Sequence, residues 1–123
     1  MTLPIKSLAL FFTLFYAAQA LSASHDNAFA NITLKTTHVN GNVYMLEGVG
    51  GFAGGNIGVS AGEDGVLLID DQLGPMSEKI TTAIASINAA KPRFILNTHW
   101  HGDHTGNNAH FSKHATVISH SNV

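Results

Sequence analysis

Three histidines and one aspartate lie between positions 99 and 104, and this cluster constrains the fold and the chemistry of the chain more than its composition does. Neutral imidazole and carboxylate are ligand types that hold zinc and similar divalent metals in proteins. The apolar run Phe94-Ile95-Leu96 just before the cluster predicts a buried strand, and α/β sheets place their chemistry beyond the C-terminal ends of such strands. We predict a metal site, and its candidate ligands are His99, His101, Asp103 and His104.

The spacing of the candidate ligands divides them into two pairs. On an extended segment, His99 and His101 project to the same side and can reach one ion at about 2.0–2.1 Å. Trp100 between them is then expected to point into the interior. Gly102 frees the backbone to turn, so that the pair Asp103-His104 reaches a second position. The pattern predicts two metal ions, and a histidine-rich surface loop is the alternative.

This segment, from Thr98 to Asn107, resembles the signature of the metallo-β-lactamase superfamily of binuclear metallohydrolases. The resemblance extends upstream. The run Gly65-Val66-Leu67-Leu68-Ile69-Asp70 is similar to the family's strand that ends in an aspartate, and the run Gly54-Gly55-Asn56-Ile57-Gly58-Val59 is similar to the strand before it. The likeness covers positions 39–123, and the histidine motif is its most specific part.

The resemblance implies an α/β fold, the N-terminal half of an αββα sandwich. It assigns His99 and His101 to a first metal ion and Asp103 and His104 to a second, with two zinc ions expected and iron as an alternative. Metal-bound hydroxide is then expected to attack a small-molecule substrate, namely a β-lactam, lactone, ester or thioester. Asp103 is the catalytic candidate, because it would also orient the attacking oxygen.

A complete member of this family has a second, similar half that adds ligands to both metals. Two ligands per ion fall short of the three protein ligands that catalytic zinc usually has. A single half also leaves one apolar face of its sheet uncovered, which predicts aggregation or pairing. We therefore expect a truncated chain, a fragment of a longer protein, with a dimer that completes the sandwich as the alternative.

The first 20 residues predict a secretory signal peptide. Lys6 supplies a positive flank, Leu8–Ala18 is an apolar run, and Ala18-Gln19-Ala20 has the small residues of a cleavage site after Ala20. The run is shorter than the roughly 20 apolar residues of a membrane-spanning helix, so no stable membrane anchor is expected. We expect a secreted or periplasmic protein, and the absence of cysteine excludes disulfides.

The remainder is expected to comprise a polar mature N-terminal segment, 21–40, and an incomplete metallo-β-lactamase domain, 41–123. Net charge −2 with 11% charged residues gives no basic stripe, so nucleic acid is not expected as a partner. Apolar patterns within the domain predict strands and helices. The strands are Val43–Leu46, Asn56–Ala61, Val66–Ile69, Arg93–Asn97 and one from Val117, and the helices are Met76–Ala90 and Thr105–Phe111.

Two residues outside the motif are further site candidates. Phe52 lies in the glycine-rich stretch Gly48–Gly55, which resembles in position the mobile loop that overhangs the metal site in family members. The alternative is a turn whose aromatic ring packs on its own hairpin. Asp70 ends an apolar strand beside the strand that delivers the histidines, so it is expected to accept a hydrogen bond from that loop and orient a ligand. Helix capping or solvation is its alternative.

The other histidines are expected to be surface or packing residues, because they fall outside the motif. They are His25, His38, His110, His114 and His120. Two further functions remain open beside the hydrolase. One is an iron-dependent dioxygenase of thiol-derived substrates from the same superfamily, and the other is a periplasmic protein that binds metal without catalysis.

Overall fold

A computed structural model describes residues 28–123 of the chain. The predicted signal peptide, its cleavage site after Ala20, and His25 lie outside the described residues. The chain divides into two compact units, Met1–Asn31 and Ile32–Val123. Residues 28–30 of the first unit are helical, and the second unit contains the sheet and the candidate site. Within residues 28–123, no helix has the length and apolar character needed to cross a membrane.

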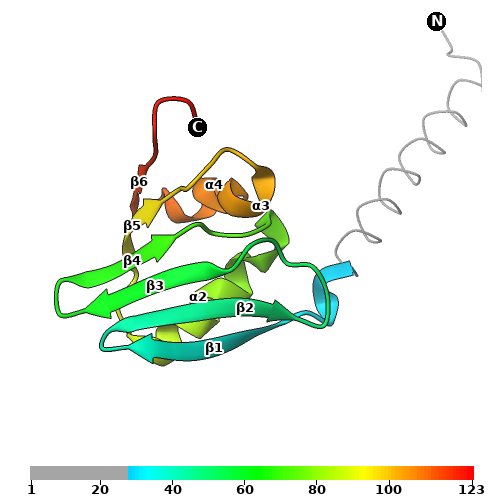
Figure 1. Cartoon of the computed structure of the whole chain (residues 1–123), viewed down its shortest axis with the longest axis horizontal. Helices are drawn as coiled ribbons and strands as arrows, with labels where there is room; N and C mark the ends of the chain where they lie inside the picture. The colour runs from blue at the N-terminus through cyan, green and yellow to red at the C-terminus, as the bar shows by residue number, and fades with distance from the viewer. Residues whose placement is uncertain (1–27) are drawn as a thin grey trace, which may run out of the picture. The chain divides into compact units, whose positions relative to one another are not determined.

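Six strands of the second unit form one sheet, in which their spatial order follows their order along the chain (Figure 1). The strands are β1 (Thr33–Asn40), β2 (Val43–Val49), β3 (Ile57–Gly62), β4 (Gly65–Ile69), β5 (Pro92–Leu96) and β6 (Thr116–Ile118). β1 to β4 pair antiparallel, whereas β4 with β5 and β5 with β6 pair parallel. Parallel neighbours need long crossover connections, and these carry the helices. The predicted α/β fold is confirmed.

The crossover from β4 to β5 contains a 3-10 helix, η1 (Gly74–Met76), and then α2 (Ser77–Ile87). The 3-4-3 spacing of apolar residues that predicted a helix here is confirmed, since Ile80 and Ile84 are buried. The helix ends earlier than the predicted Ala90, because Asn88 adopts an extended conformation. The backbone N–H of Asn88 still donates to the carbonyl of Ile84, 2.9 Å away.

The predicted helix Thr105–Phe111 is wrong as a continuous element. Two short helices, α3 (Gly102–Thr105) and α4 (Asn108–Phe111), occupy this part of the crossover from β5 to β6. The interruption has a tertiary cause. The N–H of Gly106 donates to the carbonyl of Gln72, and that of Asn107 donates to the carboxylate of Asp71. These amides are therefore bonded outside the helix that the local sequence favours.

The expectation that the first strand begins at Val43 is also wrong. β1 precedes it, inside the stretch 21–40 that reads as polar and weakly patterned. β1 is an edge strand, and most of its side chains are exposed. A strand of this kind needs no apolar alternation, so the pattern that marks half-buried strands is absent from its sequence.

The two faces of the sheet differ in what covers them. One face packs against α2, and its core includes Leu46, Val59, Leu68 and Ile95, each at most 1% exposed. On the other face, Ile69, Leu96 and Ile118 align across β4, β5 and β6, and they are 39%, 38% and 43% exposed. The second face is therefore apolar and open within the described residues, as a half sandwich predicts.

Candidate metal centre

The histidine loop leaves the sheet at the C-terminal end of β5, where α3 begins at Gly102 (Figure 1). His101 occupies the N-cap position of α3 with extended backbone angles, and its carbonyl accepts the N–H groups of His104 and Thr105. The chain therefore turns immediately after His101. The predicted turn at Gly102 is observed, but the predicted extended segment is wrong, because residues 98–100 form bends and only His101 directly before the turn has extended backbone angles.

The structure brings part of the predicted ligand set together. The rings of His99 and His104 lie with centroids 3.9 Å apart, and those of His99 and His101 lie 4.9 Å apart. Among the described residues, His99, His104 and Asp70 offer ligand atoms that all lie within 4.8 Å of one another. His101 is exposed and lies outside this group. Metal binding by each of the four predicted residues remains a prediction.

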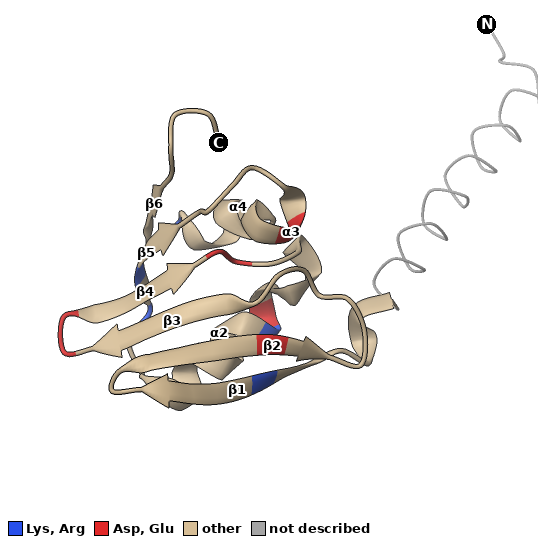
Figure 2. Ribbon diagram, in the orientation of Figure 1, with Lys and Arg blue, Asp and Glu red and all other residues tan. Residues whose placement is uncertain are grey.

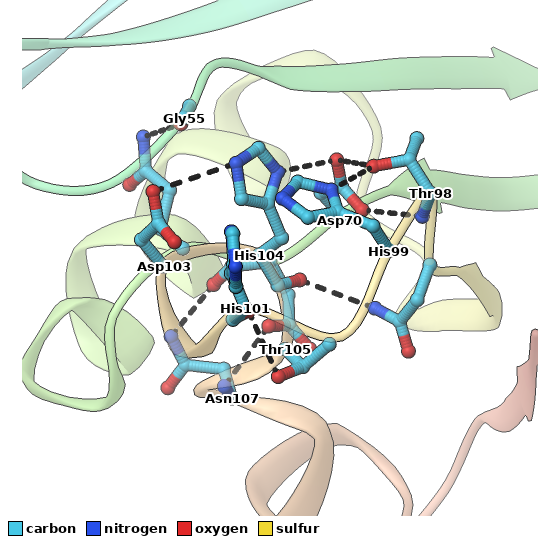
Figure 3. A network of polar contacts seen from close by, with 12 residues as sticks. Gly55, Asp70, Thr98, His99, His101, Asp103, His104, Thr105 and Asn107 are labelled. Atoms are coloured by element: carbon cyan, nitrogen blue, oxygen red, sulfur yellow. Dashed lines mark hydrogen bonds and ion pairs between the residues drawn. The ribbon is translucent and has the colours of Figure 1, made fainter. Parts of the chain in front are cut away.

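Asp70 is buried and holds the histidine loop in place (Figure 3). Its Oδ1 accepts the backbone N–H of Thr98 at 2.8 Å. Its Oδ2 accepts the Thr98 hydroxyl at 2.7 Å and the Nδ1–H of His104 at 2.7 Å. Three donors therefore converge on one carboxylate, which is the contact with the loop that the sequence suggested.

This carboxylate fixes the tautomers of two histidines. A carboxylate only accepts hydrogen bonds, so His104 donates from Nδ1 and keeps the lone pair of Nε2. The Thr98 hydroxyl gives its proton to Asp70, so it accepts from Nδ1 of His99, 3.0 Å away. The neutral ring of His99 then also keeps its Nε2 lone pair. Both imidazoles are held in the form in which a metal binds them.

The second nitrogen of the His104 ring lies close to the carboxylate of Asp103. Nε2 of His104 and Oδ2 of Asp103 lie 3.4 Å apart, and both are electron-pair donors when the ring is neutral. Two ligand atoms at about 2.0–2.1 Å from a tetrahedral zinc ion are separated by roughly 3.4 Å. The donor types and their separation therefore fit a zinc ion placed between them, and such an ion removes the repulsion between two facing acceptors.

Trp100 does not pack into the interior, so that prediction is wrong. Its side chain is 67% exposed, and its ring meets the ring of His101 at a centroid distance of 4.6 Å. The alternation of a strand does not apply here, because β5 has already ended at Leu96 and residues 98–100 form bends. At this point the chain has left the sheet, and no core lies on the other side of the segment.

Hydrogen bonds of buried residues connect the histidine loop to residues 71–73. The carbonyl of His104 accepts the backbone N–H of Asp71 at 3.0 Å and the side-chain amide of Asn97 at 3.1 Å. Asn107, 1% exposed, donates its backbone N–H to Asp71 and its side-chain amide to the carbonyls of Asp71 and Leu73. These bonds join the β4–α2 connection to the histidine loop. Burial raises the pKa of Asp71 to about 6, although the hydrogen bond from Asn107 opposes this rise.

Gln72 and Gly55 are site residues that sequence reasoning missed. Gln72 is fully buried with φ +60°, and its side-chain amide donates to the carbonyl of Gly55 at 2.8 Å. The N–H of Gly55 donates to the carbonyl of Asp103 at 3.2 Å. The glycine-rich stretch is thus fastened directly to the metal loop. The sequence indicated only that the glycine-rich stretch resembles a loop overhanging the site, and no sequence signal marks Gln72.

Phe52 lies in the connection between β2 and β3 and is 70% exposed. Its exposure leaves the ring available to solvent or to a bound molecule. The proposed contact of this ring with a substrate remains a prediction. The other described histidines lie away from the centre. His38 bonds the carbonyl of Gly41, and His110 and His114 flank the ring of Phe111.

Replacing Asp70 by asparagine is expected to weaken zinc affinity about 10- to 100-fold. The amide cannot accept all three donors, so His99 and His104 lose the contacts that fix their rings, and outer partners of this kind typically contribute that much. Competition with a chromophoric chelator measures the affinity. The matched control is Asp64→Asn in the exposed β3–β4 turn, which is expected to leave it unchanged. Equal affinities in both variants would contradict the role of Asp70.

Replacing Gly55 by alanine is expected to displace the His104 ring and to lower zinc affinity. A Cβ at position 55 would collide with Cε1 of His104 and lie 3.0 Å from its Nε2, the atom available to a metal. The expected loss is about tenfold or more, since the ring must rotate away from its hydrogen bond to Asp70. Gly102→Ala is the matched control, because a Cβ at position 102 would meet nothing within 4 Å. Gly41 also has space, but its φ of +53° would strain an alanine. An NMR titration of the His104 ring resonances with zinc checks this. Unchanged zinc-dependent shifts in the Gly55 variant would rule it out.

The family model of the metallo-β-lactamase superfamily matches residues 50–123. This match covers more than half of the chain, and the chain belongs to that superfamily. The resemblance noted in the histidine motif is therefore confirmed. Comparison with curated protein sequences finds no match.

Three solved structures show what the fold is similar to. BJP-1, a subclass B3 metallo-β-lactamase of Bradyrhizobium japonicum, is 28% identical with a TM-score of 0.57, covering 69% of this chain and 32% of that one. A B3 enzyme described as the first with an active-site glutamic acid is 27% identical with a TM-score of 0.61, covering 77% and 35%. A metallo-β-lactamase of Cronobacter sakazakii is 25% identical with a TM-score of 0.61, covering 79% and 38%.

The chain thus spans about a third of the length of these structures. Its α/β fold corresponds to the N-terminal part of the metallo-β-lactamase fold.

Proposed function

We propose that this chain carries the histidine motif of an exported, zinc-dependent hydrolase that acts on a β-lactam, lactone, ester or thioester. The observation that carries the proposal is the position of His104. Its Nδ1 is held by buried Asp70, and its Nε2 faces a carboxylate oxygen of Asp103 at the separation that zinc ligands have. Membership of the superfamily supports the same chemistry.

Four residues would hold the metal ions in this proposal. They are His99 and His101 for one ion, and Asp103 and His104 for the other. When bound, zinc lowers the pKa of water to about 7 and so makes a nucleophile available at neutral pH. The set also leaves open positions for ligands from beyond the described residues, because two protein ligands do not saturate a tetrahedral ion.

The chain's own residues prepare the site for this reaction. Asp70 and Thr98 hold the two imidazoles in the tautomers that present Nε2. The carboxylate of Asp103, whose side chain is 30% exposed, can accept a proton or hydrogen bond from the attacking water and set its direction. The neighbouring glycine-rich stretch lies against the carbonyl of Asp103, so the wall of the site is backbone rather than a bulky side chain.

The substrate class is proposed from the relatives. The similar solved structures are named metallo-β-lactamases, and for this reason we propose a β-lactam as the first of the four candidate substrate classes to test. The exposed ring of Phe52 would supply an apolar contact to such a substrate. Export of the protein rests on the sequence of residues 1–20.

Hydrolysis by the purified chain tests the proposal. The chain is expressed with its N-terminal segment, its exported form is expected to begin at Leu21, and its metal content is measured. Zinc with slow turnover of a chromogenic cephalosporin is the expected result, and Asp103→Asn is expected to lower that turnover at least about a hundredfold. Iron with oxygen uptake would favour the dioxygenase instead. Zinc binding without turnover of β-lactam, lactone, ester or thioester probes would favour a metal-binding protein without catalysis.

A further inference from the structure

A groove outside the metal centre lies between α2 and the segment that contains α4. Its volume is about 300 Å³, and its lining comes from one side of α2, the segment from Ala89 to Pro92 that leads into β5, and the segment 110–114 that contains the end of α4. None of the predicted metal ligands lines it. Ligand sites in proteins start at about this volume, so the groove has room for one small organic molecule.

The floor of the groove is apolar. Ile84 of α2 and Phe111 of α4 are 2% and 1% exposed, and both line the groove together with buried Pro92. The ring of Phe111 has two neighbouring imidazoles, with centroid distances of 4.9 Å to His110 and 6.2 Å to His114. An aromatic or aliphatic group would find a rigid surface here, and its burial would be favourable.

The rim of the groove is cationic. The described residues include five lysine and arginine side chains, and three of these have partners: Lys35 with Glu47, Lys79 with the carbonyl of Ile32, and Arg93 with the carbonyl of Asp64. The other two, Lys91 and Lys113, both line the groove and form no hydrogen bond or ion pair within residues 28–123. Figure 2 shows how sparse charged residues are elsewhere on this chain.

The groove also has a positive electrostatic environment. Desolvation lowers the pKa of His114, and the nearby charges of Lys91, His110 and Lys113 lower it further. Lys91, His110 and Lys113 are therefore all close enough to His114 to affect its charge. Glu78 is the one acidic residue among those that line the groove, so the two lysines outnumber it. The chain as a whole has net charge −2, which makes this local excess of positive charge distinct.

We propose that this groove binds a small amphipathic carboxylate, in other words an organic acid with an aromatic or aliphatic body. The body lies on Phe111 and Ile84, and the carboxylate lies between Lys91 and Lys113. A neutral molecule would gain no attraction from the two ammonium groups, and an inorganic anion would gain nothing from the exposed apolar residues Ala85 and Ala89 that also line the groove. The site is independent of the hydrolase proposal, because none of its residues belongs to the metal loop.

An NMR titration of the full chain with 4-phenylbutyrate tests the proposal, and the neutral 4-phenylbutyramide is the matched ligand. The acid is expected to bind at least about fivefold more tightly than the amide, with amide shifts at Ala85 and Lys113. The double variant Lys91→Gln, Lys113→Gln is expected to bind the acid only as tightly as the parent binds the amide. Lys35→Gln, which removes a cation that is paired with Glu47, is the control and is expected to change nothing.

A second variant tests the apolar part of the site. Ala85→Trp places a large ring in the groove from an exposed position of α2, so it is expected to remove binding while the chain stays folded. Four results would overturn the proposal: equal affinity for acid and amide, unchanged affinity in the double lysine variant, binding of acetate or inorganic phosphate as tight as that of phenylbutyrate, or shifts centred on Ile69 and Leu96 of the open sheet face.

Discussion

Replacing His104 by alanine is expected to weaken zinc binding by more than about a hundredfold, which is the upper range for loss of an outer partner alone. His104 is the residue through which Asp70 and Asp103 are connected, with distances of 2.7 Å and 3.4 Å from its two ring nitrogens. Its removal takes away one ligand and leaves the Asp70 carboxylate without one of its three donors. Competition with a chromophoric zinc chelator measures the loss.

The control for this experiment is His38→Ala. His38 is also a histidine with an engaged ring, since its Nε2 lies 2.8 Å from the carbonyl of Gly41, but it belongs to β1. Its replacement is expected to leave zinc affinity unchanged. Because His104→Ala also disturbs a buried carboxylate, His99→Ala provides a second test. The ring of His99 bonds only the Thr98 hydroxyl among the described contacts, and its loss is expected to lower zinc affinity without unfolding the chain. Zinc affinity that is equal in parent, His99 and His104 variants would disprove the proposed centre.

Replacing Gly106 by alanine is expected to destabilise the fold by about 3 kcal/mol or more, the range of severe overpacking. A Cβ at this position would lie 2.6 Å from the carbonyl oxygen of Gly102, 2.7 Å from that of Gln72, and 2.7 Å from the nitrogen of Gly74. All three are backbone atoms, so no flexible side chain can move aside. The displacement would also break the hydrogen bond from Gly106 to Gln72. Urea denaturation measures the change in the free energy of unfolding.

Gly102→Ala is the matched control for the Gly106 variant. Both glycines belong to the same loop, but a Cβ at position 102 would meet nothing within 4 Å. Position 102 is also the first residue of α3, where alanine is favourable. The unfolding free energy of this variant is expected to change by less than about 1 kcal/mol. If both alanine variants unfold at the same urea concentration, the close packing of Gly106 does not hold this loop in place.

Much of the sheet follows from local sequence. Strands β3 and β4 are apolar segments joined by a polar turn, and α2 has a 3-4-3 spacing of apolar residues, of which Ile80 and Ile84 are buried. Such patterns reflect burial on one face, which a sequence displays directly. β1 lacks the pattern because it is an exposed edge strand, so the sequence gives no sign of it. The break between α3 and α4 was equally hidden, because the acceptors for its amides come from Gln72 and Asp71, far away in the chain.

The candidate site divides in the same way. The motif from His99 to His104 specifies the donor types, and the resemblance that it carries identifies the family. The orientation of Trp100 was not predictable from alternation, since alternation holds only within a strand and Trp100 lies in a bend beyond the end of β5. Gln72 and Gly55 acquire their roles only through contacts across the β4–α2 connection.

The amino-acid sequence by itself determined which chemical groups this protein offers to a metal, because imidazole and carboxylate donors within one short loop need no partner from elsewhere to be recognised. The tertiary structure decided which atoms of those groups are available. Asp70 lies 34 positions before His104, and the 2.7 Å bond between them selects the tautomer that presents Nε2 toward Asp103. A proton on one ring nitrogen depends on a contact between distant residues, and only folding makes that contact.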